Sequence, residues 1–335
     1  MSETAPRALT DSWELGGVTV PNRVVLAPLA GIGNWFVRLQ AKRHGAGLCV
    51  SEMVSSFAVH HRNERTLREL LRVHPDERAG GPTAIQLFGH DPEVMRSAAE
   101  AVARATGADL IDLNMGCPVP KVCKTGAGAA LLRDPGRAAE LALAAREGSG
   151  LPVTVKLRTS RTHEDRDGVE VARRLVSDAG VAGLTLHPRS ATQRHKGAPD
   201  YALVRELVQE LPVPVIVSGG LQDVESARRA WEETGAAAIM LARGSLGNPW
   251  LFEQLLGDRD EEPTHQEVLA ELDWVMDRAE EHLGEPRAAR YLRKFYGWYL
   301  DRLGAGAEVR DALQRADTLA QARAVLAGLE LIRAA

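Results

Sequence analysis

The chain has 335 residues, 44% of them hydrophobic, which is enough to bury a large core, and its length suits one large domain with a small appendage. Its formal net charge of −4 does not by itself indicate nucleic-acid binding, and three cysteines without CxxC spacing argue against a disulfide framework or a zinc ribbon, so no metal site is expected. The polar N-terminal segment lacks the layout of a signal peptide and no stretch approaches the roughly 20 apolar residues of a membrane span, so we expect a cytoplasmic protein that does not enter a membrane.

Short runs rich in Val, Ile and Leu recur along the first three quarters of the chain, and each gap between them is long enough for a helix. This spacing is typical of parallel strands that are joined by crossover helices. The eight expected strands are Val24–Leu29, Leu48–Met53, Thr83–Phe88, Leu110–Met115, Val153–Arg158, Gly183–His187, Val213–Ser218 and Ala238–Ala242.

The segments between these strands are Ala- and Leu-rich, and several begin with Asp or Asp-Pro, as helix starts do. The expected helices are Pro92–Ala105, Pro135–Glu147, Asp165–Ala179, Tyr201–Glu210 and Asp223–Glu233. Eight such units predict an α/β fold, a closed (β/α)8 TIM barrel. An open doubly wound sheet is the rival, but it has fewer strands and a Gly-rich loop after the first strand, and the segment from Ala27 to Gly31 is not GxGxxG.

The strand pattern stops at an acidic stretch that ends with Pro263, and only helical segments follow it. They are Thr264–Leu283, Pro286–Leu303, Ala307–Ala316 and Thr318–Leu329, and Thr264 with Glu267 has the spacing of a capping box. We therefore expect a barrel over residues 1–257 and a small helical domain over residues 258–335.

Polar side chains gather at the ends of the expected strands, where barrels of this type have their active sites. They include Gln86, Asn114, Lys156, His187, two Gly-rich turns at Ser218-Gly219-Gly220 and Ala242-Arg243-Gly244, and Cys117 in an Asn-x-Gly-Cys-Pro element. The Gly-rich turns indicate a phosphate-bearing ligand, and a lysine with two side-chain amides suits a flat heterocycle. FMN meets both requirements, whereas a Schiff base on Lys156, as in an aldolase, is the competing use of that lysine.

Several segments resemble the bacterial tRNA-dihydrouridine synthases of the B type, over roughly Pro21 to Leu329. The Asn-x-Gly-Cys-Pro element is the most specific of them, because neither barrel packing nor FMN binding requires a cysteine there. The segments are Ala27 to Gly31, Asp112 to Lys121, Lys156 to Thr159, His187 to Ser190, Val217 to Gly220, Gly247 to Trp250 and Arg293 to Tyr299.

The resemblance implies an enzyme that reduces the C5=C6 bond of uridine in tRNA, with FMN as cofactor and NADPH as transient reductant. Cys117 would be the proton donor, and Arg189 would lie near the substrate. The residues implied at the cofactor are Ala27, Pro28, Leu29, Gln86, Asn114, Lys156, His187, Ser218, Gly219, Gly220, Ala242 and Arg243.

A uridine in folded RNA must leave its stack, so a second RNA-contacting surface is expected. Arg290, Arg293 and Lys294 lie at helical spacing in the C-terminal segment, with aromatic residues between them. From Asp258 onward, however, 11 Lys and Arg stand against 16 Asp and Glu. The alternatives are an FMN-dependent ene-reductase or dehydrogenase acting on a free pyrimidine or another small molecule, a Schiff-base lyase, and an inactive RNA-binding module. We expect a monomer.

Overall fold

The structure of the protein, a computed structural model, describes residues 7–334 and the side chains of residues 7–329. Its contacts divide the chain into two compact units, the first ending at Arg243 and the second beginning at Gly244. Each unit is described by itself.

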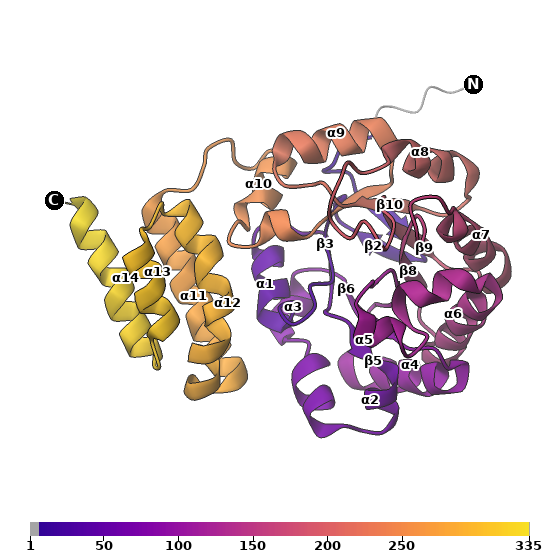
Figure 1. Cartoon of the computed structure of the whole chain (residues 1–335), viewed down its shortest axis with the longest axis horizontal. Helices are drawn as coiled ribbons and strands as arrows, with labels where there is room; N and C mark the ends of the chain where they lie inside the picture. The colour runs from indigo at the N-terminus through magenta and orange to yellow at the C-terminus, as the bar shows by residue number, and fades with distance from the viewer. Residues whose placement is uncertain (1–6, 335) are drawn as a thin grey trace. The chain divides into compact units, whose positions relative to one another are not determined.

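The first unit is a closed barrel of eight parallel strands, which confirms the expected fold class (Figure 1). Neighbouring strands pair in chain order, and β3 pairs with β11 to close the ring. The strands are β3 (Val24–Leu26), β4 (Leu48–Val50), β6 (Thr83–Phe88), β7 (Leu110–Met115), β8 (Val153–Arg158), β9 (Gly183–His187), β10 (Val215–Ser218) and β11 (Ala238–Leu241).

Helices follow the strands around the barrel. The expected ones are α4 (Pro92–Thr106), α6 (Pro135–Ser149), α7 (Asp167–Ala179), α8 (Tyr201–Glu210) and α9 (Val224–Thr234). Asp91, Asp134, Asp200 and Asp223 cap four of them by accepting hydrogen bonds from first-turn N–H groups. Elements that the sequence pattern did not predict are α1 (Trp35–Arg43), β5 (Val54–Ser55), α2 (Ser56–His60), the π-helical turn η1 (Thr66–Leu70), α3 (Pro75–Ala79), α5 (Pro120–Cys123) and the 3₁₀ segments η2 (Gly128–Arg133) and η3 (Arg243–Ser245).

A short N-terminal hairpin packs against the core of the barrel. Its strands β1 (Trp13–Leu15) and β2 (Val18–Val20) are antiparallel, and Trp13, Leu15 and Val20 belong to the same apolar cluster as Leu48, Leu110, Ile216 and Ala238. Those four residues begin their strands or lie one position inside them, so the hairpin covers the amino ends of the barrel strands. The carboxyl ends of the strands lie at the opposite mouth of the barrel.

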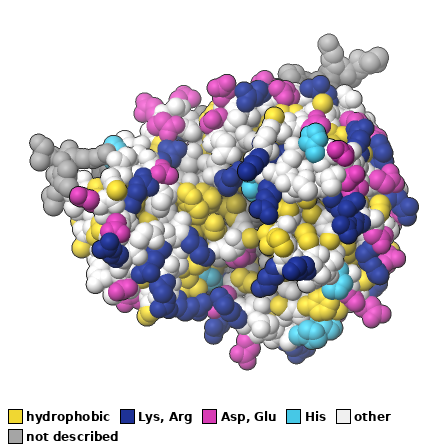
Figure 2. Space-filling view, viewed as in Figure 1, with side chains coloured by type: hydrophobic (Ala, Val, Ile, Leu, Met, Phe, Trp, Pro, Cys, Tyr) yellow, Lys and Arg dark blue, Asp and Glu magenta, His cyan; other side chains and the backbone are white. Residues whose placement is uncertain are grey.

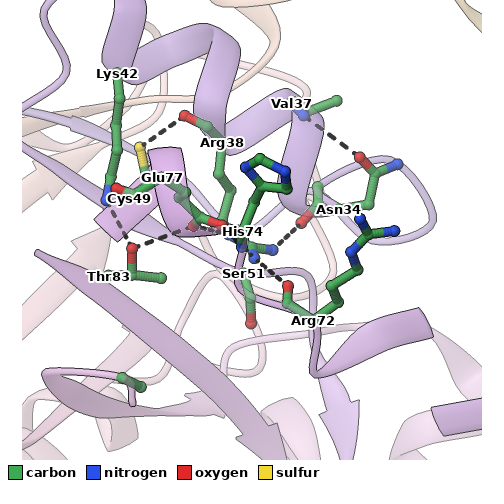
Figure 3. Close-up of polar contacts among 12 residues, drawn as sticks. Asn34, Val37, Arg38, Lys42, Cys49, Ser51, Arg72, His74, Glu77 and Thr83 are labelled. Carbon is green, nitrogen blue, oxygen red and sulfur yellow. Dashed lines mark hydrogen bonds and ion pairs between the residues drawn. The ribbon is translucent and has the colours of Figure 1, made fainter. Parts of the chain in front are cut away.

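A buried ion pair ties α1 to α3 on one side of the barrel (Figure 3). Arg38 donates to Glu77 over 2.5 Å, and neither side chain is exposed. Lys42 reaches the backbone oxygen of Glu77 and the hydroxyl of Thr83, at 2.7 Å each. Because each buried charge has a charged or polar partner, this cluster holds the two helices on the barrel wall.

The second unit is helical, with α10 (Trp250–Leu256), α11 (His265–Leu283), α12 (Glu285–Arg302), α13 (Ala307–Arg315) and α14 (Leu319–Ala334). Thr264 and Glu267 form the expected capping box. The contact boundary lies after Arg243, whereas the sequence placed it after Gly257. The reason is that α10 packs within the second unit, as the guanidinium of Arg302 over the ring of Trp250 shows.

Candidate functional site

The barrel residues singled out from the sequence come together at the carboxyl ends of the strands. On this side of the molecule Lys and Arg side chains lie around hydrophobic ones (Figure 2). Ala27, Pro28 and Leu29 follow β3, Gln86 and Asn114 lie on β6 and β7, Lys156 on β8, and His187 ends β9. Ser218 ends β10 and is followed by Gly219 and Gly220, and Ala242 and Arg243 follow β11.

Four side chains from three neighbouring strands form a continuous hydrogen-bonded row inside the barrel. Asp112 accepts from Thr154 and from Gln86, both at 2.6 Å. The amide nitrogen of Asn114 donates to Gln86 Oε1 over 2.9 Å. Burial raises the pKa of Asp112 to about 6, although both hydrogen bonds and the charge of Lys156 act in the opposite direction.

Cys117 lies in the loop that follows β7 and is partly exposed. Its backbone N–H donates to Asn114 Oδ1 over 2.9 Å, and its carbonyl accepts from Ala129 N at 3.0 Å. Burial raises the pKa of the Cys117 thiol, against a smaller opposing effect of the Val119 N–H. The thiol therefore holds its proton more tightly than a free cysteine does.

Cationic side chains converge at this end of the barrel. Burial, together with the charge of Arg158, lowers the pKa of Lys156 to about 8. Burial and the charge of Arg243 lower the pKa of Arg189 as well. Within the described part of the chain, Lys156 Nζ makes no hydrogen bond. Such a group of cations at a barrel mouth suits an anionic ligand.

His187 lies against the turn after β10. A Cβ atom at Gly219 would lie 2.5 Å from His187 Cδ2, and the φ angle of Gly219 is 99°, so only glycine fits here. Burial and then the charge of Lys156 lower the pKa of His187, which keeps the imidazole neutral. The Gly-rich turn is therefore packed closely against a neutral ring.

The loop after β9 is held by two arginines. Arg158 donates to the carbonyl oxygens of Ser190 and Arg194, at 3.0 and 2.8 Å. Arg189 donates to the carbonyl of Gly197 and lies 3.3 Å from His187 Nε2. Arg189 is therefore fixed at the edge of the site by its own loop.

The remaining candidates lie on α12 in the second unit. Arg290 and Lys294 are exposed, and the ammonium of Lys294 lies 4.4 Å from the centre of the Tyr291 ring. Arg293 is bonded within the unit, to Ala316 O at 3.1 Å and Asp317 Oδ1 at 3.2 Å. Arg293 therefore also has a structural role, which the helical spacing could not show.

The sequence pattern missed two residues of the hydrogen-bonded row, Asp112 and Thr154. Both point to the same side of their strands as a predicted residue two positions on, Asn114 and Lys156 respectively. The alternation of side chains along a strand could therefore have identified both residues from the sequence. Within residues 7–334, no three potential metal ligands come together and no helix is long and apolar enough to cross a membrane.

The solved structures that the chain resembles share its barrel. A variant of morphinone reductase in complex with tetrahydroNAD matches 78% of this chain and 94% of its own, with a TM-score of 0.56 and 17% identity. A 2-naphthoyl-CoA reductase in complex with 2-naphthoyl-CoA matches 75% of this chain and 52% of its own, with a TM-score of 0.57 and 15% identity. At these identities the likeness shows the fold alone.

The family model described as dihydrouridine synthase (Dus) matches residues 25–334. The tRNA-dihydrouridine synthase B of Pseudomonas aeruginosa is 36% identical over 317 residues, which cover 93% of this chain and 94% of that protein. The protein of the same name from Xanthomonas axonopodis pv. citri is 33% identical over 311 residues, covering 91% and 92%. This chain is an oxidoreductase and belongs to the dihydrouridine synthase family.

Proposed function

We propose that the protein is an FMN-dependent tRNA-dihydrouridine synthase, a cytoplasmic monomer that reduces the C5=C6 bond of uridine in tRNA with NADPH as reductant. The names of its relatives support the tRNA substrate. The observation that supports the chemistry best is the combination of a protonated Cys117 thiol with an unbonded Lys156 ammonium at one barrel mouth.

The residues present fit FMN. The turn at Ser218, Gly219 and Gly220, with Ala242 and Arg243, would hold the phosphate, because close backbone approach and positive charge both favour an anion. The Lys156 ammonium would lie beside the electron-rich ring. The remaining contacts to the ring would come from Ala27, Pro28, Leu29, Gln86, Asn114 and His187.

Cys117 would protonate C5 of the uracil ring. FMN, once reduced by NADPH, would supply the hydride for C6. The raised pKa of Cys117 keeps the proton on the thiol at neutral pH until the substrate carbon accepts it. Because Asn114 holds the backbone N–H of Cys117, the donor stays in place while the substrate enters. Arg189 would contact the substrate from the loop after β9.

The second unit would bind the tRNA through Arg290, Arg293 and Lys294. All three belong to the helical domain that the sequence predicts over residues 258–335, and the predicted catalytic barrel is residues 1–257. A cation beside an aromatic ring, as Lys294 is beside the half-buried Tyr291, suits phosphates and unstacked bases.

The absorption spectrum of the purified protein tests this proposal, recorded under anaerobic conditions before and after NADPH and then after unmodified bulk tRNA. We expect flavin bands that bleach with NADPH and return with tRNA. Return with a free pyrimidine or an enone, but not with tRNA, would favour a small-molecule reductase. Absence of flavin bands after reconstitution with FMN would overturn the proposal.

Replacing Cys117 by alanine separates the two half-reactions. The Cys117→Ala variant should bind flavin and be bleached by NADPH as the unaltered protein is, because the thiol takes no part in that step. Its single-turnover reoxidation by tRNA should be slower by roughly 10²–10⁴-fold, the usual contribution of a positioned general acid. Stopped-flow absorbance gives both rates. Loss of flavin from the variant would show instead that Cys117 is structural.

A further inference from the structure

The row of hydrogen bonds inside the barrel has a direction. At one end is the carboxylate of Asp112, which only accepts, and at the other are the backbone N–H groups of Gly116 and Cys117, which only donate. Gln86 and Asn114 lie between these ends. Each of these side-chain amides can therefore keep both of its hydrogen bonds in one orientation only. In that orientation its nitrogen faces the Asp112 end of the row and its oxygen faces the Cys117 end.

Burial makes that direction costly to change. Asp112 is 1% exposed and Gln86 is not exposed at all, so water cannot replace a lost partner. If the Gln86 amide turned over, its oxygen would face the Asp112 carboxylate and its nitrogen would face the nitrogen of Asn114. Asn114 would then have to turn as well, and it would release the N–H of Cys117.

We propose that Asp112 is a positioning residue for Cys117, acting through Gln86 and Asn114, whose amide orientations its carboxylate fixes. The reaction assigned to Cys117 rests on the proposed function. The effect of the row on the backbone of residues 114–117 and on the environment of the thiol does not depend on which reaction Cys117 takes part in.

Thr154 makes the direction testable, because its hydroxyl can donate or accept. In an Asp112→Asn variant, the new amide nitrogen can donate to Thr154, and the amide oxygen can still accept from Gln86. The row then keeps its direction without a charge. In a Thr154→Val variant the carboxylate still accepts from Gln86, so the direction is again kept. Only the double variant leaves the new side-chain amide without a partner that holds its orientation.

The alkylation rate of the Cys117 thiol measures how well the loop after β7 is held in place. Iodoacetamide labelling as a function of pH, followed by tryptic digestion, separates all three cysteines, because cleavage after Lys121 divides Cys117 from Cys123. Cys49 is buried, and burial raises its pKa to about 12, so its labelling reports global unfolding. These rates can be measured with or without flavin, and the single-turnover reoxidation by tRNA gives the functional effect.

We expect Asp112→Asn and Thr154→Val to stay within about threefold of the unaltered protein in both measurements. The double variant and Asp112→Leu should lose roughly 10–100-fold in reoxidation rate, since a displaced catalytic group costs that much. In these two variants Cys117 should label faster and at lower pH, with Cys49 still protected.

The proposal would be overturned if Asp112→Asn were as damaging with Thr154 present as without it, or if the double variant left Cys117 labelling unchanged. Labelling of Cys49 together with Cys117 would also overturn it, because Asp112 would then act on the stability of the whole barrel. If the unaltered protein does not reduce tRNA, the proposed function fails, but the labelling still decides the role of Asp112.

Discussion

Two ionisable side chains in the barrel, the half-buried Lys156 and the buried Asp112, have pKa values shifted toward neutral pH. Lys156 has a pKa lowered to about 8 and Asp112 a pKa raised to about 6, in both cases because burial disfavours the charged form. Between these values both are charged and attract each other. The positive charge of Lys156 is therefore present at pH 7 but is lost as the pH rises through 8.

Flavin affinity should follow this titration. Below pH 8 the charged Lys156 attracts the electron-rich ring of FMN, and above it the neutral amine does not, so the dissociation constant of FMN should rise by up to about tenfold per pH unit. Titration of the apoprotein with FMN at pH 7, 8 and 9, followed by flavin fluorescence, measures this. Lys156→Met should weaken binding at pH 7 and remove the dependence. An equal pH dependence in Lys156→Met would assign it to another group.

The sequence predicted which residues lie at the carboxyl ends of the strands, but not how these residues bond to one another. The ends of the strands marked Lys156 and Cys117, because a barrel has its ligand there. The sequence did not show that the Gln86 amide forms hydrogen bonds with Asp112 and Asn114, because a side-chain amide can bond to a ligand as well as to a neighbouring residue. The roles of these residues toward FMN and tRNA stay predictions.

Helices and strands could be predicted where their sequence shows a clear pattern of buried and exposed residues. Strands β6, β7, β8 and β9 begin and end where the sequence predicted, because proline or glycine flanks each of them on at least one side. Helix α1 was missed because every residue from Trp35 to Lys42 is buried, including charged ones, so it has no polar face to give a helical period. The three-residue strands β1 and β2 are too short for any period.

The buried ion pair between Arg38 and Glu77 should contribute more to the free energy of unfolding than an ion pair on the surface does. In an Arg38→Met variant, Glu77 would remain in the core without its charged partner, and the free energy of unfolding should fall by about 3–5 kcal/mol. Arg104→Met, which breaks an exposed pair with Glu100 on α4, should cost about 0.5 kcal/mol or less. Urea unfolding curves of both variants give the comparison.

Removing both partners provides the control for that pair. Arg38→Met combined with Glu77→Leu should recover most of the lost stability, because neither charge of the pair then stays buried without the other. If Arg38→Met is no more destabilising than Arg104→Met, the pair does not fasten α1 to α3.

At the scale of the whole molecule, charge is distributed unevenly along the chain. From Asp258 onward the net charge is −5, and the rest of the chain has +1. A tRNA-binding role for the helical unit therefore cannot rest on its average charge. It has to rest on a local face. Arg290 and Lys294 are exposed and lie four residues apart on α12, and Lys294 contacts the ring of Tyr291.

Two substitutions of equal charge in that unit test whether RNA binds a local face. Arg290→Glu and Arg315→Glu each change the net charge by the same amount, and both side chains are exposed, but Arg315 lies on α13 and pairs with Asp311. We expect Arg290→Glu to weaken tRNA binding roughly tenfold and to lower the slope of log K against log salt by about 1, as the loss of one phosphate contact does. Arg315→Glu should change neither quantity. Filter binding at several salt concentrations measures both, and the rate of flavin bleaching by NADPH checks that the barrel is intact. Equal weakening by the two variants would indicate a general effect of charge, and no weakening by Arg290→Glu would show that the tRNA contacts another surface.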